Sequence, residues 1–224
     1  MNSNNCKVIG VTGGMGCGQT LFTKFLKEEG AKTISADQVA HQIVDENPEL
    51  KKELRKAFGR NIYTRSGKLK RKLLAKIVFK DENKIRLLNR IIQPVMVGKI
   101  IDKIEQARES RQYQLIFVDA ALIFEANLEK MFDSIIVVTS KMSDRIERIK
   151  KRDGITNKEI MDRIRKQIPI EDKVKWADFV IKNEDGIGNL KNNARTMYKK
   201  LIENNRESKT SLKMNSQKRM KRNA

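Results

Sequence analysis

A glycine-rich segment with the sequence VTGGMGCGQT occupies residues 11–20 and separates two stretches of different periodicity. Residues 7–12 are rich in valine and isoleucine, which is typical of a buried strand. From residue 18 to 29 apolar side chains recur every three or four positions, as on one face of a helix, and Gly30 ends the pattern. The order strand, glycine loop, helix predicts the beginning of a nucleotide-binding α/β domain.

Residues 13–20 match the phosphate-binding pattern G-x-x-x-x-G-K-[ST] at every fixed position except the lysine, which is replaced by Gln19. Glycines allow the backbone N–H groups to face phosphate oxygens, and the following helix adds its positive end. Thr20 would offer its hydroxyl to Mg²⁺, whereas Gln19 can donate a hydrogen bond but brings no charge to the β- and γ-phosphates. A glycine-rich turn without a ligand is the alternative, and the flanking strand and helix disfavour it. The candidate nucleotide-binding residues are Gly13, Gly14, Met15, Gly16, Cys17, Gly18, Gln19, Thr20 and Leu21.

Two aspartates follow predicted strands, at the sheet edge where ligands of such folds bind. Asp37 comes after a short strand at 31–36 and could accept a proton from an attacking hydroxyl or orient magnesium; it could also simply cap the next helix. Asp119 ends the apolar run 115–118 and could hold magnesium directly or through water, or be an ordinary strand-end residue.

Arg145, Arg148 and Arg152 recur at three- and four-residue spacing in a predicted helix over 142–152, so they share one face. In a phosphoryl-transfer enzyme such arginines would clamp phosphates from a mobile lid, whereas on an arbitrary helix they would form a solvated face. Lys24, one turn into the helix after the glycine loop, is another cation whose side chain could extend toward the phosphates.

Strands separated by helical segments predict a three-layer α/β fold, in which a parallel sheet is flanked by helices. Helical patterns also run from residue 37 through 111, and Pro94 is expected to break or kink them before a long helix that begins at Val95. The other predicted elements are strands at 115–119, 134–139 and 179–181 and helices at 142–152, 156–168, 171–176 and 187–203.

The chain has 224 residues, of which 39% are hydrophobic and 34% charged, and this length suits one α/β domain with a small inserted lid. No apolar run approaches the roughly 18 to 20 residues that cross a bilayer, and the N-terminus lacks a secretory pattern, so we expect a cytoplasmic protein. Two cysteines do not indicate a disulfide framework.

The formal net charge of +20 raises nucleic acid as a partner. Acidic residues interleave with basic ones along the predicted helices, however, so nucleic acid is not expected to be the primary partner. The exception is the polar, basic segment 205–224, which is predicted to be a disordered tail that follows a single domain at 1–204.

Blocks spread along the chain together resemble the dephospho-coenzyme A kinase family, from residue 7 to about residue 203. No single block is decisive, but their order and spacing are highly specific. The matching blocks read VTGGMGCG, SADQVAH, SGKLKRKLLAKIVF, LNRIIQPVM, DAALIFE, RIERIKKRDGIT and KWADFVIKN.

This resemblance implies a P-loop kinase that uses ATP and Mg²⁺ to phosphorylate the ribose 3'-hydroxyl of dephospho-coenzyme A. It implies that Asp37 is the catalytic base and that Arg148 and Arg152 are lid arginines, within a lid region at about 142–170. Phe124 and Glu125 fall in the family's substrate-side segment. Helices inserted at about 45–95 would receive the substrate's nucleotide and pantetheine portions, and Thr20 and Asp119 would hold the metal.

The sequence departs from the family pattern at four motif positions, occupied here by Gln19, Ser35, Gln93 and Ala121. These departures leave two alternatives open: a catalytically impaired homologue that binds nucleotide or coenzyme A, and a P-loop kinase that acts on another nucleoside or nucleotide. The sequence is compatible with a monomer or a homo-oligomer.

Overall fold

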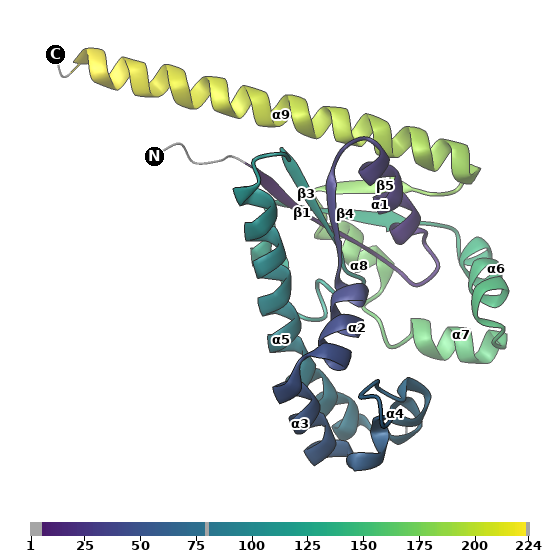
Figure 1. Cartoon of the computed structure of the whole chain (residues 1–224). Helices are drawn as coiled ribbons and strands as arrows, with labels where there is room; N and C mark the ends of the chain where they lie inside the picture. The colour runs from purple at the N-terminus through teal and green to yellow at the C-terminus, as the bar shows by residue number, and fades with distance from the viewer. Residues whose placement is uncertain (1–5, 79–80, 223–224) are drawn as a thin grey trace. The chain divides into compact units, whose positions relative to one another are not determined.

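The computed structural model describes residues 6–78 and 81–222, with side chains described as far as residue 207 (Figure 1). The chain divides into two compact units. The first comprises residues 1–33 and 107–224, and the second comprises residues 34–106.

The chain forms a five-stranded sheet with the strand order β2-β3-β1-β4-β5, of which β1, β3, β4 and β5 lie wholly in the first unit. The central strand β1 pairs in parallel with β3 and β4, and β4 pairs in parallel with β5. The predicted strands are therefore confirmed, and the carboxyl ends of β1, β3 and β4 lie at one edge. The strands are β1 (Lys7–Gly13), β2 (Lys32–Ser35), β3 (Leu115–Asp119), β4 (Ser134–Thr139) and β5 (Phe179–Lys182).

Helices α1 (Gln19–Glu28) and α9 (Gly186–Arg222) pack on the same face of this sheet (Figure 1). The side chains between them form one hydrophobic cluster, and each such residue contributes about 1.5 to 3 kcal/mol when fully buried. The cluster includes Ile9, Val11, Phe117, Ile136 and Val138 from the strands, Phe22, Phe25 and Leu26 from α1, and Leu190, Ala194 and Leu201 from α9.

Three shorter helices complete the first unit: α6 (Met142–Asp153), α7 (Asn157–Ile164) and α8 (Ile170–Lys175). Thr156 and Glu159 form a reciprocal capping box that starts α7. Helix α6 ends at Gly154, whose φ of 65° suits glycine. The three helices were predicted, with α7 slightly shorter than expected.

Helix α9 is longer than predicted, because the backbone stays helical to Arg222 where the sequence predicted a disordered tail from residue 205. No glycine or proline occurs after Gly188 to stop the helix. Since extending an existing helix needs no new nucleus, residues without an apolar face can continue it.

The second unit is helical, and its helices enclose a small core of their own. A buried tyrosine ties two of its segments together: the Tyr63 hydroxyl donates to the carbonyl oxygen of Val44 at 3.0 Å, and burial raises the pKa of Tyr63 to about 12. Leu50, Leu54 and Ile62 are almost fully buried. The elements are α2 (Ala36–Glu46), α3 (Pro48–Phe58), η1 (Arg60–Ile62), α4 (Arg71–Val78) and most of α5 (Glu82–Glu109).

Of the two effects expected of Pro94, the break is wrong, because α5 runs without interruption from Glu82 to Glu109, whereas the kink stays a prediction. Proline removes one backbone hydrogen bond and crowds the carbonyl one turn earlier. In a helix of 28 residues the turns on both sides of Pro94 remain intact and hold the helix together.

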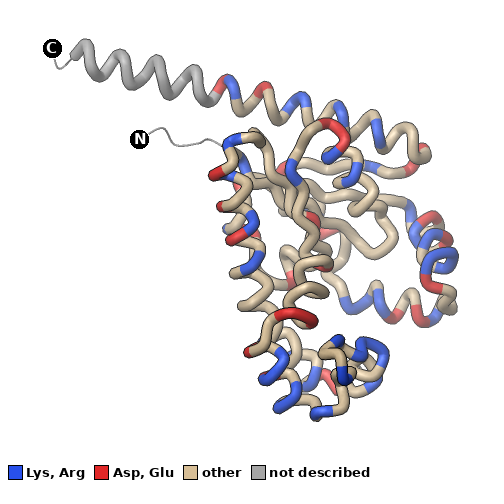
Figure 2. Tube along the Cα trace, in the orientation of Figure 1, with Lys and Arg blue, Asp and Glu red and all other residues tan. Residues whose placement is uncertain are grey.

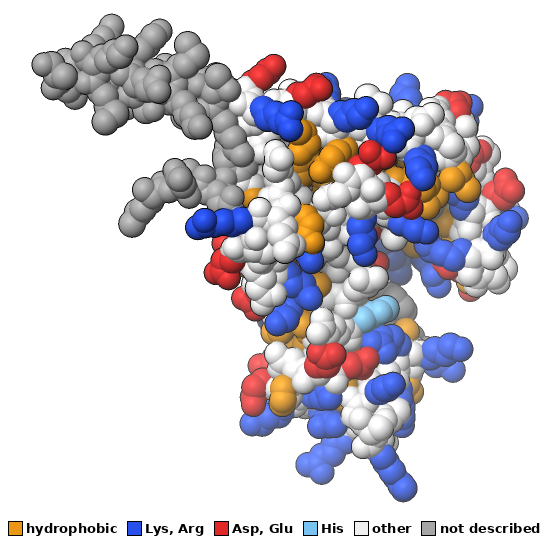
Figure 3. Space-filling view, turned by 45° about the horizontal axis from the view of Figure 1, so that its top comes forward, with side chains coloured by type: hydrophobic (Ala, Val, Ile, Leu, Met, Phe, Trp, Pro, Cys, Tyr) orange, Lys and Arg blue, Asp and Glu red, His pale blue; other side chains and the backbone are white. Residues whose placement is uncertain are grey.

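Basic residues concentrate on one part of the second unit, along α3, η1 and α4 (Figure 2). Residues 51–76 contain eleven lysines and arginines and a single acidic residue, whereas the rest of that unit contains six basic and eight acidic residues. Many of these side chains reach solvent (Figure 3). In the part of the chain that is described, no helix is long and apolar enough to span a membrane.

Candidate phosphate-binding site

The glycine loop joins the end of β1 to the start of α1, and its backbone conformation depends on glycine. Gly16 and Gly18 have φ angles of 80° and 89°, a region that costs an L-residue about 1 to 2 kcal/mol. A Cβ on Gly13 would lie 2.6 Å from the carbonyl oxygen of Val138, and one on Gly18 would collide with Nδ2 of Asn183. Neighbouring elements therefore pack directly on the loop, and the first N–H groups of α1 provide the kind of site that favours an anion.

Gln19 is buried and joins the loop to the end of β3. Its Nε2 donates to Oδ1 of Asp119, and the hydroxyl of Thr23 lies 3.2 Å from the other carboxylate oxygen. The structure thus brings together Gln19 and Asp119, which are 100 residues apart in sequence. Thr20, on the first turn of α1, is exposed.

Two other loop residues turn toward the protein interior. Leu21 is partly buried and packs against the hydrophobic cluster. Cys17 is fully buried, and burial raises the pKa of its thiol despite the nearby positive charge of Arg145. Both side chains support the loop from the core.

Two of the three arginines on α6 contact the loop. Arg145 donates from Nε to the carbonyl oxygen of Met15 at 2.9 Å, and Arg148 donates to the carbonyl oxygen of Gly16 at 3.2 Å. Arg152 instead pairs with Asp153 through two hydrogen bonds of 2.7 and 3.0 Å. The sequence predicts Arg148 and Arg152 as nucleotide-binding residues. Arg145 is not among them, although helical spacing places Arg145 and Arg148 on the same face of the helix.

Asn183 and Gln167 also hold the loop, and sequence reasoning missed both. Asn183 follows β5 and donates from Nδ2 to the carbonyl oxygen of Cys17 at 2.9 Å. Gln167 accepts the N–H of Met15 at 3.0 Å. The position of Asn183 directly after a strand could have signalled its role, whereas nothing in the local sequence distinguishes Gln167.

Phe124 and Glu125 lie in the loop that follows β3, and α8 supports both. Glu125 Oε1 forms an ion pair of 2.7 Å with Lys173, a lysine with 0% exposure that also donates to the carbonyl oxygen of Ala121. Phe124 packs edge to face against Trp176, with 5.3 Å between ring centroids. These contacts fix the loop, and the predicted role in substrate binding stays a prediction.

Asp37 lies in the first turn of α2, and its carboxylate is exposed. The idea that it only caps this helix is wrong, because Ser35 is the N-cap and its hydroxyl accepts the N–H of Gln38 at 3.3 Å. Asp37 belongs to the second unit. Its carboxylate is thus not used to start the helix.

The parallel sheet and the glycine loop between β1 and α1 define a P-loop protein of the kinase type. The sequence matches the family model for dephospho-CoA kinase over residues 7–189, and the chain belongs to this family.

Curated dephospho-CoA kinases from distant bacteria align along almost their whole length. The enzyme of Listeria monocytogenes is 32% identical over 198 residues, covering 88% of this chain and 98% of the relative. That of Aquifex aeolicus is 35% identical over 195 residues, covering 87% and 97%.

Solved structures agree with the sequence comparison. Dephospho-CoA kinase from Campylobacter jejuni superimposes with a TM-score of 0.67 at 29% identity, covering 88% of this chain and 98% of that one. A crystal structure from Thermus thermophilus gives a TM-score of 0.74 at 25% identity, with the same coverage. The fold predicted from the sequence is therefore confirmed.

Proposed function

We propose that this protein transfers the γ-phosphate of ATP to the 3'-hydroxyl of the ribose of dephospho-coenzyme A, giving coenzyme A and ADP. The observation that carries the proposal is the alignment with dephospho-CoA kinases along 98% of a relative's length, with the glycine loop in place. The P-loop alone supports phosphoryl transfer in general, and the family supplies the acceptor.

In the proposed chemistry, Asp37 is the catalytic base. Its carboxylate accepts the proton of the 3'-hydroxyl as that oxygen attacks the γ-phosphorus, and ADP leaves with the electron pair of the broken P–O bond. The backbone N–H groups of residues 13–20 bind the phosphates of ATP, and Arg148 acts beside them. Arg152 takes part if it exchanges its partner Asp153 for a phosphate.

We propose that Thr20 and Asp119 hold magnesium. Mg²⁺ is commonly held in proteins by one or two oxygen ligands together with waters and phosphates, and a hydroxyl and a carboxylate meet that requirement. Asp119 already accepts hydrogen bonds from Gln19 and Thr23, so contact through water suits it best. When bound, the ion neutralises charge on the β- and γ-phosphates. Within the described residues, no cluster of three or more His, Cys, Asp or Glu side chains offers another metal site.

We propose that the helices at 45–95 bind the nucleotide and pantetheine portions of dephospho-coenzyme A, and that Phe124 and Glu125 are substrate-binding residues. The concentrated positive charge of residues 51–76 supports this assignment, because the substrate carries a pyrophosphate. A small-molecule pathway enzyme of this kind is expected in the cytoplasm.

A second candidate, nucleotide binding without turnover, is favoured by Gln19. This position holds a lysine in the usual P-loop, and a neutral amide bonded to Asp119 does not supply the missing charge. Loss of one preorganised electrostatic contact typically lowers kcat by about 10² to 10³. Reduced turnover is therefore the expected consequence of Gln19 if no other group replaces the lysine.

The test is to incubate the purified protein with Mg-ATP and dephospho-coenzyme A and to measure ADP release. Adenosine, AMP and shikimate are supplied as competing acceptors. The proposal expects release that depends on dephospho-coenzyme A and is lost in Asp37→Asn. ATP binding without release from any acceptor would favour the second candidate. Preference for another acceptor would establish a different kinase.

A further inference from the structure

The guanidinium of Arg145 lies directly against the glycine loop. Its Nε donates to the carbonyl oxygen of Met15 at 2.9 Å, and its Nη2 would be 2.7 Å from a Cβ built on Gly14. The backbone of Arg145 approaches the loop as well, since its carbonyl oxygen would be 2.8 Å from a Cβ on Gly16. Two glycines thus make room for this one arginine.

Arg145 is buried, and none of the carboxylates in the described part of the chain forms an ion pair with it. Its exposure is 3%, and within the described residues its hydrogen bond goes to the neutral carbonyl of Met15. Arg148 beside it donates to the carbonyl oxygens of Gly16 and Asn183 and to the hydroxyl of Ser140, again without an acid. A buried cation that lacks an anionic partner is energetically costly, so this pair of arginines favours an anion at the loop.

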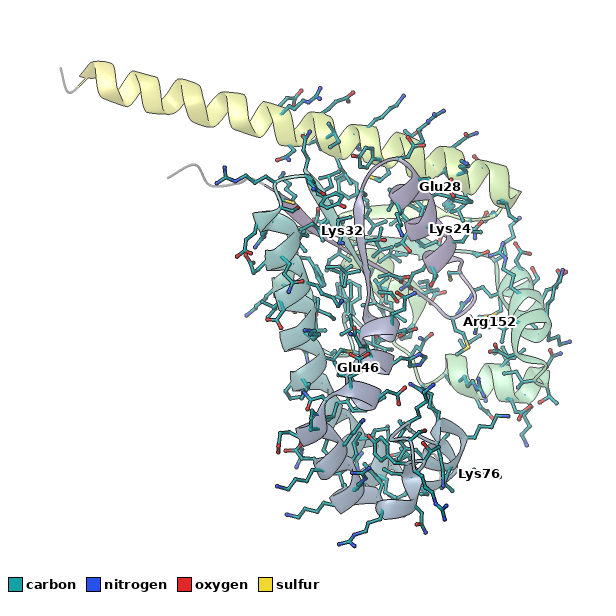
Figure 4. All side chains as sticks on the ribbon, viewed as in Figure 1. Lys24, Glu28, Lys32, Glu46, Lys76 and Arg152 are labelled. Carbon is teal, nitrogen blue, oxygen red and sulfur yellow. The ribbon has the colours of Figure 1, made fainter. Side chains whose placement is uncertain are left out.

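Of the other cations considered for this role, Arg152 is already paired. Arg152 forms its two hydrogen bonds to Asp153. Lys24 lies close enough to Glu28 to lower the pKa of that carboxyl, to which a hydrogen bond from Lys191 is the larger contributor. Figure 4 shows Lys24 and Glu28 together on α1. Arg152 is therefore engaged by an acid, whereas the hydrogen bond of Arg145 goes to a backbone carbonyl of the loop itself.

We propose that Arg145 supplies at the phosphate-binding loop the positive charge that Gln19 lacks. Two residues then act at the loop: Gln19 provides a hydrogen bond, which fixes Asp119, and Arg145 on α6 provides the positive charge. Because its guanidinium is buried against Gly14 and Met15, solvent screens it weakly, and its field acts on phosphates bound by the neighbouring N–H groups. This inference rests on the proposed binding of ATP at the loop, and it makes Arg145 a residue that tunes the site electrostatically.

The test measures ATP affinity by calorimetry and turnover of dephospho-coenzyme A in four proteins: natural, Arg145→Gln, Gln19→Lys and the double variant. Arg145→Gln keeps a hydrogen-bond donor but loses the charge, and we expect about 10²-fold lower kcat/KM and at least tenfold weaker ATP binding. Adenosine, which lacks phosphates, should show no such loss. Arg195→Gln, on α9 and paired with Glu29, is the matched control and should match the natural protein.

The decisive comparison is the change in ATP affinity that Gln19→Lys causes in the natural protein and in the Arg145→Gln variant. If Arg145 replaces the lysine charge, Gln19→Lys restores most of the affinity lost in Arg145→Gln and changes the natural protein little. If Gln19→Lys changes ATP affinity by the same factor in both proteins, the inference is overturned and Arg145 is a purely structural support.

Arg145→Lys separates loss of charge from a folding defect, because it alters the side chain but keeps the positive charge. Retention of ATP affinity in Arg145→Lys, with loss in Arg145→Gln, supports the inference, whereas equal loss in both overturns it. ATP affinity that follows this pattern without turnover would refute only the proposed kinase activity. A natural protein that does not bind ATP would overturn both.

Discussion

Replacing Gly18 with alanine tests how the loop is built. Gly18 has φ 89° and ψ 16°, so alanine is forced into the left-handed region at a cost of about 1 to 2 kcal/mol. The new Cβ also collides with Nδ2 of Asn183, which donates to the buried carbonyl of Cys17. Displacing that amide leaves a buried carbonyl without its partner, at a cost of about 1 to 3 kcal/mol. Gly18→Ala should therefore lower the free energy of unfolding by about 2 to 5 kcal/mol in all.

Gly154 provides the matched control, because it has φ 65° and ψ 25° and a Cβ there would meet no atom within 4 Å. Gly154→Ala isolates the backbone cost of about 1 to 2 kcal/mol. Urea unfolding can be followed by the fluorescence of Trp176, the single tryptophan. Adding Asn183→Ala to Gly18→Ala should cost less than the sum of the two single changes, since both lose the same hydrogen bond. Equal losses for Gly18→Ala and Gly154→Ala would refute the packing argument.

Three further predictions concern other charged and buried groups. Lys173→Met should destabilise the protein by about 3 to 5 kcal/mol, because it leaves the Glu125 carboxylate without its cation and only the N–H of Ile168 as a donor. Lys175→Met, at an exposed pair, should cost less than about 1 kcal/mol, and similar urea midpoints for both variants would contradict this. Cys17, with a raised pKa and 0% exposure, should resist iodoacetamide at pH 8 until urea unfolds the protein, and peptide mapping that finds it labelled in the native state would refute its burial. Burial opposes the charge of Asp45, but hydrogen bonds from the Leu69 N–H and from Arg71 lower the pKa of its carboxyl overall. The carboxylate therefore stabilises the fold above the unfolded pKa of about 3.9, and this stabilisation is lost as pH falls through the lower folded pKa. The stability deficit of Asp45→Asn in urea unfolding should accordingly be larger at pH 7 than at pH 3.5, and a deficit independent of pH would contradict the assignment.

Local patterns in the sequence predicted much of the fold. Runs of β-branched residues marked β1 and β4, and the glycine loop between β1 and α1 fixed the kind of domain. A break at Pro94 does not occur, because the local cost of proline is outweighed by the long helix on both sides. The helical course of residues 205–222 was missed for a related reason, since composition does not reveal that a preceding helix can continue.

The site was less predictable, because its contacts join distant segments. Helical periodicity placed Arg145, Arg148 and Arg152 on one face, but only the packing of α6 against the loop shows that the first two contact it. The bond between Gln19 and Asp119 likewise depends on β1 and β3 being neighbours in the sheet. Sequence reasoning could name both residues as candidates, yet it could not see that they are partners.

The product formed from dephospho-coenzyme A tests the central claim most directly. Incubation of the natural protein with Mg-ATP and dephospho-coenzyme A should yield a species that co-elutes with coenzyme A, gains the mass of one phosphoryl group and shows a new phosphomonoester signal by ³¹P NMR. The signal should be assigned to the ribose 3' position, and it should be absent with Asp37→Asn. Hydrolysis of ATP without this product, or a phosphoryl group at another position, would contradict the account.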